Sequence, residues 1–258
     1  MNYKLKLFSN LLKNRIMKSK IKKDIKLVNQ VIDITYPSTT YKIYNKLKKS
    51  LIGGDLAPGT KLKIDDLKKQ YQAGTNPIRE SLTLLIADDL VTKIDQKGFK
   101  VSDATQEKFD EILKTRIWIE SIALEESMKN KKNINEWEEE LIILNHRLQK
   151  AERSLIYDPE NLDSWEMVHK KFHLTLVSRS KSDFMNKFCE LLYDQNMRYR
   201  YLIKKKKSYK KRKVTIEHKG ILDAVLARDI NKSKSLLIKH YITTSGFITL
   251  NSPSFIRK

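Results

Sequence analysis

The 258-residue chain has few of the residues that cross-link or sharply turn a backbone. A single cysteine, Cys189, excludes an intramolecular disulfide framework and favours a reducing, cytoplasmic setting. Seven glycines and five prolines are well below the usual shares, which favours a mainly helical chain with few tight turns. No apolar run approaches the roughly 18 residues that suggest a bilayer span. The composition therefore argues against a disulfide-rich protein and against an integral membrane protein.

Acidic residues are also scarce relative to basic ones. The chain has 52 Lys and Arg against 31 Asp and Glu, which leaves a formal net charge of +21. This excess favours a polyanionic partner such as nucleic acid. Drift toward lysine in an AT-rich coding sequence produces the same excess, so the charge alone does not establish DNA binding.

The distribution of turn residues predicts four segments. Five of the seven glycines fall between residues 53 and 98, and long helical patterns follow. We expect a basic N-terminal extension at 1–38, a winged helix-turn-helix domain at 39–103, an all-helical domain at 104–250 and a C-terminal tail at 251–258. The extension lacks the apolar core and cleavage site of a secretory signal, so a solvated arm is expected there rather than a dedicated DNA arm.

The glycine-rich part has the pattern of a DNA-binding winged helix. Apolar residues recur at helical spacing in three short stretches, at 43–52, 67–71 and 78–86. Thr75 or Asn76 is expected to cap the third helix, with Pro77 at its first position. Alternating apolar and polar residues then predict a hairpin. Lys97 and Gly98 at its tip would let charge and backbone approach a duplex closely.

The start of the third predicted helix carries side chains suited to reading DNA. Thr75 and Asn76 offer short hydrogen-bonding groups for base edges, and Arg79 can fork onto a guanine or a phosphate. The plain alternative for Arg79 is a surface salt bridge with Glu80 or Asp88. Three helices followed by a hairpin favour the DNA-contacting role.

The same residues carry a family resemblance. The runs I-G-G-D-L-A-P-G-T-K-L, N-P-I-R-E-S-L-T-L-L and K-G-F-K-V resemble the DNA-binding head of the GntR family of bacterial transcription regulators. The resemblance implies that the helix beginning at Pro77 enters the major groove. The family commonly has Ser-Arg-Thr before this proline, whereas the chain has Gly74-Thr75-Asn76. The arginine that often reads guanine is therefore replaced by Thr75.

Four of the five histidines in the second half have spacing that suits a metal site. His169 and His173 lie at i and i+4, on one face of one helix, where two imidazoles can share an ion. His218 and His240 lie on two later helices whose connecting turn can bring both rings to the bundle interior. A surface or hydrogen-bonded pair is the alternative for His169 and His173 alone. His146 lies outside the pattern.

This half resembles the FCD effector domain of the FadR subgroup of GntR regulators. The resemblance rests on R-I-W-I-E, W-E-M-V-H-K-K-F-H-L-T-L, E-H-K-G-I-L-D-A-V-L-A-R-D and K-S-L-L-I-K-H. Many such domains have Asp where this chain has His169, and that change, with Q-N-M-R-Y-R, is similar to the CsiR-like branch. Imidazole in place of carboxylate removes a negative charge, which favours Zn²⁺ or Ni²⁺ over harder cations.

Three arginines are candidates to hold a small carboxylate effector, because the guanidinium fork matches that group: Arg116, Arg198 and Arg200. Family members commonly sense small organic acids through the metal and nearby polar groups. A structural ion pair with a glutamate is the alternative for Arg116. Solvent exposure is the alternative for the other two arginines.

The sequence gives little support to an enzyme. H-K-K-F-H lacks the general-base glutamate of H-E-x-x-H, and no nucleophile elbow, phosphate loop or dinucleotide fingerprint occurs. Cys189 fits a buried apolar residue better than a nucleophile.

We therefore expect a mainly α protein, with a winged helix-turn-helix followed by an all-helical, FCD-like bundle. Its expected function is that of a cytoplasmic transcriptional repressor that binds a double-stranded DNA operator as a homodimer, under the control of a metal-bound organic acid. The alternatives are a basic architectural nucleic-acid-binding protein without an effector and, less favoured, a metal-dependent hydrolase.

Overall fold

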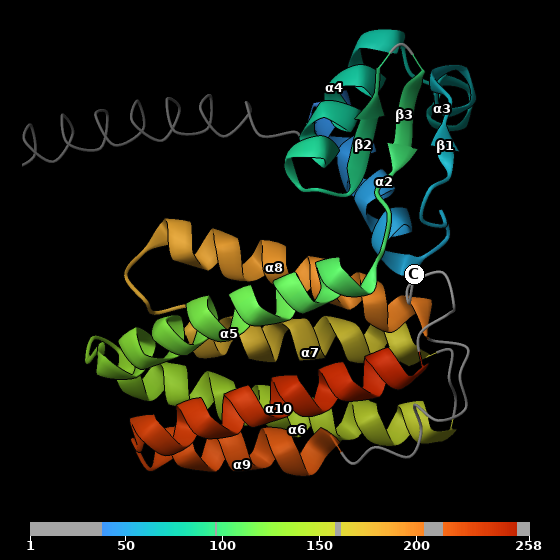
Figure 1. Cartoon of the computed structure of the whole chain (residues 1–258). Coiled ribbons are helices and arrows are strands. Elements are labelled where there is room, and N and C mark those ends of the chain that lie inside the picture. The colour runs from blue at the N-terminus through green and yellow to red at the C-terminus, as the bar shows by residue number, and fades with distance from the viewer. Residues whose placement is uncertain (1–37, 96, 158–160, 204–213, 252–258) are drawn as a thin grey trace, which may run out of the picture.

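The computed structural model describes residues 38–95, 97–157, 161–203 and 214–251 (Figure 1). Within them lie the helices α2 (Thr39–Gly53), α3 (Ile64–Tyr71), α4 (Thr75–Ala87), α5 (Gln106–Lys129), α6 (Ile134–Tyr157), α7 (Leu162–Val177), α8 (Asp183–Leu202), α9 (Val214–Leu226) and α10 (Ile230–Asn251), and the strands β1 (Lys61–Leu62), β2 (Val91–Ile94) and β3 (Gly98–Val101). The expected N-terminal arm up to residue 37 and the expected tail from residue 252 lie outside the described residues, as do residues 96, 158–160 and 204–213.

The N-terminal part forms a small head with its own core. Helix α2 begins after Ser38, whose hydroxyl accepts a hydrogen bond from the Tyr41 backbone N–H at 3.3 Å. It ends at Gly54, where a φ of +79° suits a residue without a Cβ atom. The apolar faces of the three helices meet at buried residues, among them Leu47, Leu51, Ile78, Leu82 and Leu85.

The helix with the candidate base-reading residues, α4, starts earlier than the sequence suggested. Gly74 is its N-cap and Pro77 is its third residue. The expectation that Thr75 or Asn76 caps the helix and that Pro77 opens it is therefore wrong. Because the first N–H groups of a helix have no acceptor within it, proline is tolerated at the third position as well as at the first.

A three-stranded antiparallel sheet with the order β1-β3-β2 closes the head. The predicted hairpin is present, with Val91 opposite Val101 and a φ of +93° at Gly98. Strand β1 was not predicted, because two residues give too short an alternation to recognise. It pairs with β3 through Leu62 opposite Phe99, and this apolar pair joins the head core.

In the described ranges, the second domain consists of the helices α5 to α10. Helix α5 packs against α8 and α10, while α6 packs against α7 and α9. Figure 1 shows the head above the bundle, with α8 as the bundle helix that faces it. The predicted fold class, a winged helix-turn-helix followed by an all-helical bundle, is confirmed.

No helix in the described ranges is both long enough and apolar enough to cross a membrane.

Candidate metal centre and DNA-reading head

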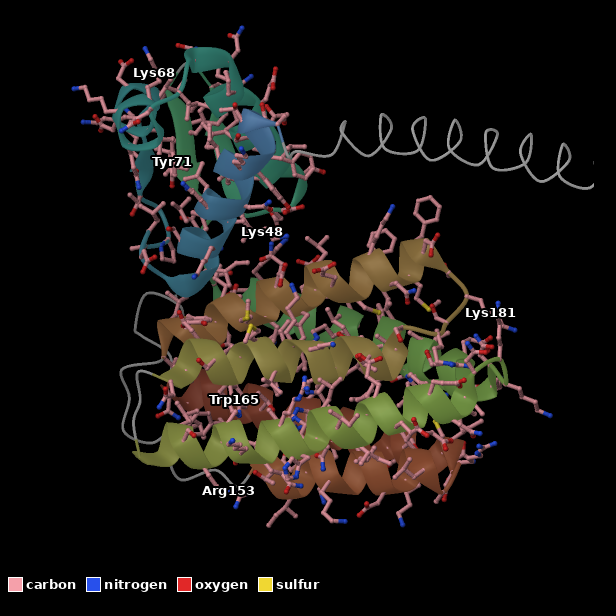
Figure 2. All side chains as sticks on the ribbon, turned by 180° about the vertical axis from the view of Figure 1, so that it is seen from behind. Lys48, Lys68, Tyr71, Arg153, Trp165 and Lys181 are labelled. Carbon is pink, nitrogen blue, oxygen red and sulfur yellow. The ribbon has the colours of Figure 1, made fainter. Side chains whose placement is uncertain are left out.

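The bundle brings the four predicted histidines together from three helices. His169 and His173 lie on α7, His218 on α9 and His240 on α10, and all four are buried. Their candidate ligand atoms lie within 4.8 Å of one another. Trp165, one turn before His169 on α7, stacks on that ring with the centroids 4.3 Å apart. Figure 2 labels Trp165 in the bundle. The cluster is therefore enclosed in the helical core and fits a metal site.

Three of the imidazoles point the same nitrogen at one another. The Nε2 atoms of His169, His173 and His218 are 3.1 Å apart in each of the three pairs. With metal–nitrogen bonds of about 2.1 Å, tetrahedral ligands lie about 3.4 Å apart and ligands at right angles about 3.0 Å apart. The observed triangle is close to the arrangement that three nitrogens take on one face of an octahedron.

The Nδ1 contacts of two cluster histidines, His169 and His240, bear on which of their ring nitrogens carries the proton. His169 Nδ1 is 2.5 Å from the hydroxyl of Tyr193, which in turn donates to Glu166 at 3.3 Å. When the hydroxyl proton points to the carboxylate, Nδ1 of His169 is the donor toward the tyrosine oxygen. His240 Nδ1 lies 2.7 Å from Glu217, an acceptor that requires the same tautomer.

The His173 ring also has a tyrosine hydroxyl beside its Nδ1 atom. His173 Nδ1 is 3.3 Å from the Tyr241 hydroxyl, which donates to Glu120. Burial, with the nearby Glu120, raises the pKa of Tyr241 well above its usual value, so this hydroxyl keeps its proton. The Nε2 atoms of His169 and His173 then face each other as lone pairs, an arrangement that a cation stabilises.

Both histidines of α7 are held neutral, which is the state that binds metal. Burial, and then the neighbouring imidazoles, lowers the pKa of His169 and of His173 well below the usual range. A metal ion bound here would therefore compete with few protons at neutral pH.

These shifts predict how the metal-free protein responds to acid. The unfolded chain takes up protons at His169 and His173 near pH 6.5, whereas the folded protein does not, so the free energy of unfolding should fall as the pH drops below about 6.5. The expected slope is up to about 1.4 kcal/mol per pH unit for each histidine. Urea denaturation of chelator-treated protein at pH 7.5, 6.5 and 5.5 measures it. A His146→Ala variant should keep the slope, and equal stability at the three pH values would contradict the prediction.

Two of the predicted effector arginines lie beside the cluster, each already paired with a glutamate. Arg116 contacts Glu120 at 2.6 and 3.2 Å, and Arg200 contacts Glu166 at 2.6 and 2.9 Å. The glutamate partner expected as an alternative for Arg116 is thus present. Arg198 is also buried, but it donates to the Ser102 carbonyl at the end of the head and is not among the residues that line the cavities at the cluster.

Little space remains at the cluster. One cavity beside His169, His240 and Arg200 leaves about 20 Å³ for the centre of a water molecule, and another beside Arg116 and His173 leaves about 10 Å³. Each is near the minimum needed to hold one water. A ligand with several carbon atoms requires side chains or helices to move.

The residues behind the ligands were not identified from the sequence. Glu166 lies three residues before His169, which puts both on one face of α7, yet the sequence alone does not show which of the two a metal or an arginine would contact. Tyr193, Tyr241 and Glu120 gave no local signal, because their partners are far away in the chain.

In the head, all five candidate DNA-contacting residues are exposed: Thr75, Asn76, Arg79, Lys97 and Gly98. The alternative ion pairs of Arg79 are not made within the described part of the chain. Glu80 accepts from the Thr40 hydroxyl at 2.7 Å, and Asp88 pairs with Lys48 at 3.0 Å. The Arg79 side chain is therefore exposed to solvent near the N-terminus of α4.

Two family profiles match the chain. The profile described as "Bacterial regulatory proteins, gntR family" matches residues 39–101, and the FCD domain profile matches residues 111–243, about half of the chain. The chain belongs to the GntR family of bacterial regulatory proteins, with an FCD domain. The resemblance seen in the sequence is confirmed, and the protein is a transcriptional regulator and not an enzyme.

Relatives of this GntR protein align with it over most of their own length. The chain is 34% identical over 198 residues to the HTH-type transcriptional regulator BphR of Paraburkholderia xenovorans. The aligned part covers 76% of this chain and 80% of BphR. The chain is 29% identical to the HTH-type transcriptional repressor GlaR of Escherichia coli, over 78% of this chain and 91% of GlaR. The structure of E. coli McbR/YncC matches with a TM-score of 0.69 at 23% identity, over 83% of this chain and 98% of McbR, and supports the fold.

Proposed function

We propose that this GntR regulator is a repressor whose operator binding is controlled by a small organic acid bound at a metal ion in the histidine cluster. The observation that carries the proposal is the triangle of Nε2 atoms, 3.1 Å on each side, with the tautomers of His169 and His173 set by tyrosines behind them. The E. coli relative GlaR is described as a repressor. An architectural DNA-binding protein has no use for such a cluster. We place the repressor in the cytoplasm, where its operator lies.

His169, His173, His218 and His240 are the residues that would hold the ion. Nitrogen ligands without a carboxylate among them favour Zn²⁺ or Ni²⁺ over Mg²⁺ or Ca²⁺. When bound, the ion would supply a Lewis-acidic position for a carboxylate oxygen. Glu217 and the two tyrosines orient the rings through their Nδ1 atoms.

The charges around the cluster support an anionic effector. Among the described residues, Arg116 and Arg200 with a divalent ion face the carboxylates of Glu120, Glu166 and Glu217, which leaves an excess of one positive charge at the site. A single carboxylate group would neutralise it, and an uncompensated buried charge is costly. We assign effector contacts to Arg116 and Arg200, which line the cavities. The effector role predicted for Arg198 stays a prediction, because its guanidinium contacts the Ser102 carbonyl at the end of the head instead.

A direct experiment tests this function. The wild-type protein would select a duplex from a random DNA library, and gel shifts would compare binding to it with chelator, with Zn²⁺ or Ni²⁺, and with the metal plus small carboxylic acids. Metal and acid together should change the affinity for DNA. Identical binding in every condition would contradict control through the cluster.

Arg79→Ala is expected to weaken binding to the selected duplex by about 1 to 3 kcal/mol, the value of a good bidentate contact to a base. The gel-shift titration is run at fixed salt. Lys97→Ala on the wing is the comparison, since loss of a phosphate contact should weaken all sequences similarly and flatten the salt dependence. Unchanged binding by Arg79→Ala would remove α4 from the DNA interface.

We also propose a homodimer that presents two heads to a near-palindromic operator. Helices α5 and α8 pack together and carry large apolar side chains exposed to solvent, Trp118 (57%), Ile122 (52%), Phe184 (76%) and Phe188 (52%). The i, i+4 spacing aligns each pair along its helix. Figure 1 shows that the N-terminal half of α8 extends beyond the head. Such a face favours association with a second copy.

Trp118→Ser combined with Phe188→Ser should convert the protein to a monomer. Light scattering after gel filtration should give twice the chain mass of 30.4 kDa for the wild type and the chain mass for the variant. Ile142→Ser with Ile143→Ser removes exposed apolar residues from α6 and is the control. A wild-type monomer, or a control that dissociates equally, would contradict this face as the interface.

A further inference from the structure

A buried carboxylate on α8 holds lysines from both domains. The Asp194 side chain is 4% exposed, and its Oδ1 atom lies 2.6 Å from Lys170 Nζ on α7. Its Oδ2 atom lies 3.1 Å from Lys48 Nζ on α2 of the head. Figure 2 shows Lys48 at the boundary between the head and the bundle. One side chain therefore joins the helix of the histidine cluster to the DNA-binding head.

On the head side, the contacts continue to the recognition helix. Lys48 Nζ also lies 3.0 Å from Asp88 Oδ2, and Asp88 is the C-cap of α4. The Tyr44 hydroxyl donates to Asp88 at 2.5 Å and accepts from Lys48 at 3.2 Å. Burial by itself lowers the pKa of Lys48, but Asp194, Tyr44 and Asp88 together raise it above its usual value, so the ammonium stays charged.

On the bundle side, two adjacent pairs join α7 to α8. His169 contacts Tyr193 at 2.5 Å, and the next residue on each helix forms the pair of Lys170 with Asp194. A displacement of α7 that reorients His169 therefore also moves the lysine that holds Asp194. The His169 ring and the Lys170–Asp194 ion pair involve consecutive residues on both helices. A movement of α7 relative to α8 at one contact is therefore accompanied by movement at the other.

Other residues of α8 support the head from the same side. Gln195 donates to the backbone carbonyl of Asp88, and Arg198 donates to that of Ser102. The partly buried Tyr201 side chain packs against the head core. Among the contacts described for α8, those of Asp194 join a charged group from each domain.

We propose that Asp194 couples the histidine cluster to the DNA-binding head by sharing its carboxylate between Lys170 and Lys48. This inference rests on the proposed function, since the cluster must bind a ligand for anything to be transmitted. Ligand binding that moves α7 changes the pull of Lys170 on Asp194, and Lys48 passes the change to α4 through Asp88. Such a ligand shifts the head only if it binds two arrangements of the domains with different affinity. The Asp194 contacts, made in one arrangement, supply that difference.

The test measures Zn²⁺ affinity by chelator competition, with and without the duplex selected by the wild-type protein. The wild type should show about a 5- to 150-fold difference between the two conditions. Lys48→Met keeps the aliphatic stem and removes the charge, and it should reduce the difference to less than about twofold with Zn²⁺ affinity in the absence of DNA preserved. Lys219→Met, which removes the exposed pair with Asp223 on α9, is the control and should keep the wild-type difference.

Asp194→Asn gives a second, independent reading. If Asp194 and Lys48 act together, the double variant should show the same coupling as either single variant. Should Asp194→Asn not fold, Lys48→Met decides alone, because its side chain is 20% exposed and tolerates the change. A wild type whose Zn²⁺ affinity ignores DNA would overturn this inference, whereas the proposed function is decided separately by the gel shifts with metal and acid together. A coupled wild type together with a fully coupled Lys48→Met would overturn this inference alone.

Discussion

Replacing His173 with leucine is expected to weaken Zn²⁺ binding by more than about 100-fold, since even the groups behind metal ligands are worth 10- to 100-fold. His173 Nε2 is 3.1 Å from the Nε2 atoms of both His169 and His218, so its loss removes one corner of the triangle. Leucine has a similar volume and keeps the packing at a side chain that is 1% exposed. Chelator competition measures the affinity.

Thermal unfolding provides the second measurement for this variant. Zn²⁺ at 100 times its dissociation constant stabilises a folded protein by about 2.7 kcal/mol, and this stabilisation should vanish in His173→Leu. His146→Leu on the exposed face of α6 should behave as the wild type. If His173→Leu binds Zn²⁺ as tightly as His146→Leu does, the cluster is not the metal site.

Glu166→Gln is expected to destabilise the fold by about 3 to 5 kcal/mol, because it leaves the Arg200 guanidinium buried without its counter-charge. The two side chains are 2% and 3% exposed, and two hydrogen bonds of 2.6 and 2.9 Å join them. Glu166 also accepts from Tyr193, which orients His169, so metal affinity should fall by about 10- to 100-fold. Urea denaturation and chelator competition measure the two effects.

The matched control is a solvent-exposed ion pair on the protein surface. Lys219 and Asp223 are 2.6 Å apart on α9 with side chains 59% and 55% exposed, and Asp223→Asn should cost no more than about 0.5 kcal/mol. A Glu166→Gln variant that is as stable as Asp223→Asn would show that Arg200 is satisfied by other groups. Asn196, which accepts from Arg200 at 2.6 Å, is the first of these to consider.

Much of the fold was predictable because helical periodicity is a strong signal in long segments. The i, i+4 spacing of His169 and His173 also placed both imidazoles on one face, and the turn before α10 allowed His240 to meet His218. The short strand β1 gave no such signal, because its two residues depend on pairing with β3.

The surroundings of the cluster were harder to infer, because they depend on contacts between distant parts of the chain. Tyr241 and Glu120 are 121 positions apart, and no local pattern relates them. Arg198 and Arg200 were grouped as effector residues, yet two positions on a helix differ by about 200°. Only one of them can face the cluster, and the other contacts the head.

Calorimetric titration of small carboxylic acids into the Zn²⁺-loaded protein, with and without the selected duplex, tests the central claim most directly. The acid must bind the DNA-free and DNA-bound forms with different affinity, and operator DNA must weaken its binding by the factor by which the acid weakens DNA binding. We expect a factor of about 5 to 150 for an acid that needs the metal and the four histidines. The account would be contradicted if acids bind the Zn²⁺-loaded protein but every one of them binds equally well with and without DNA.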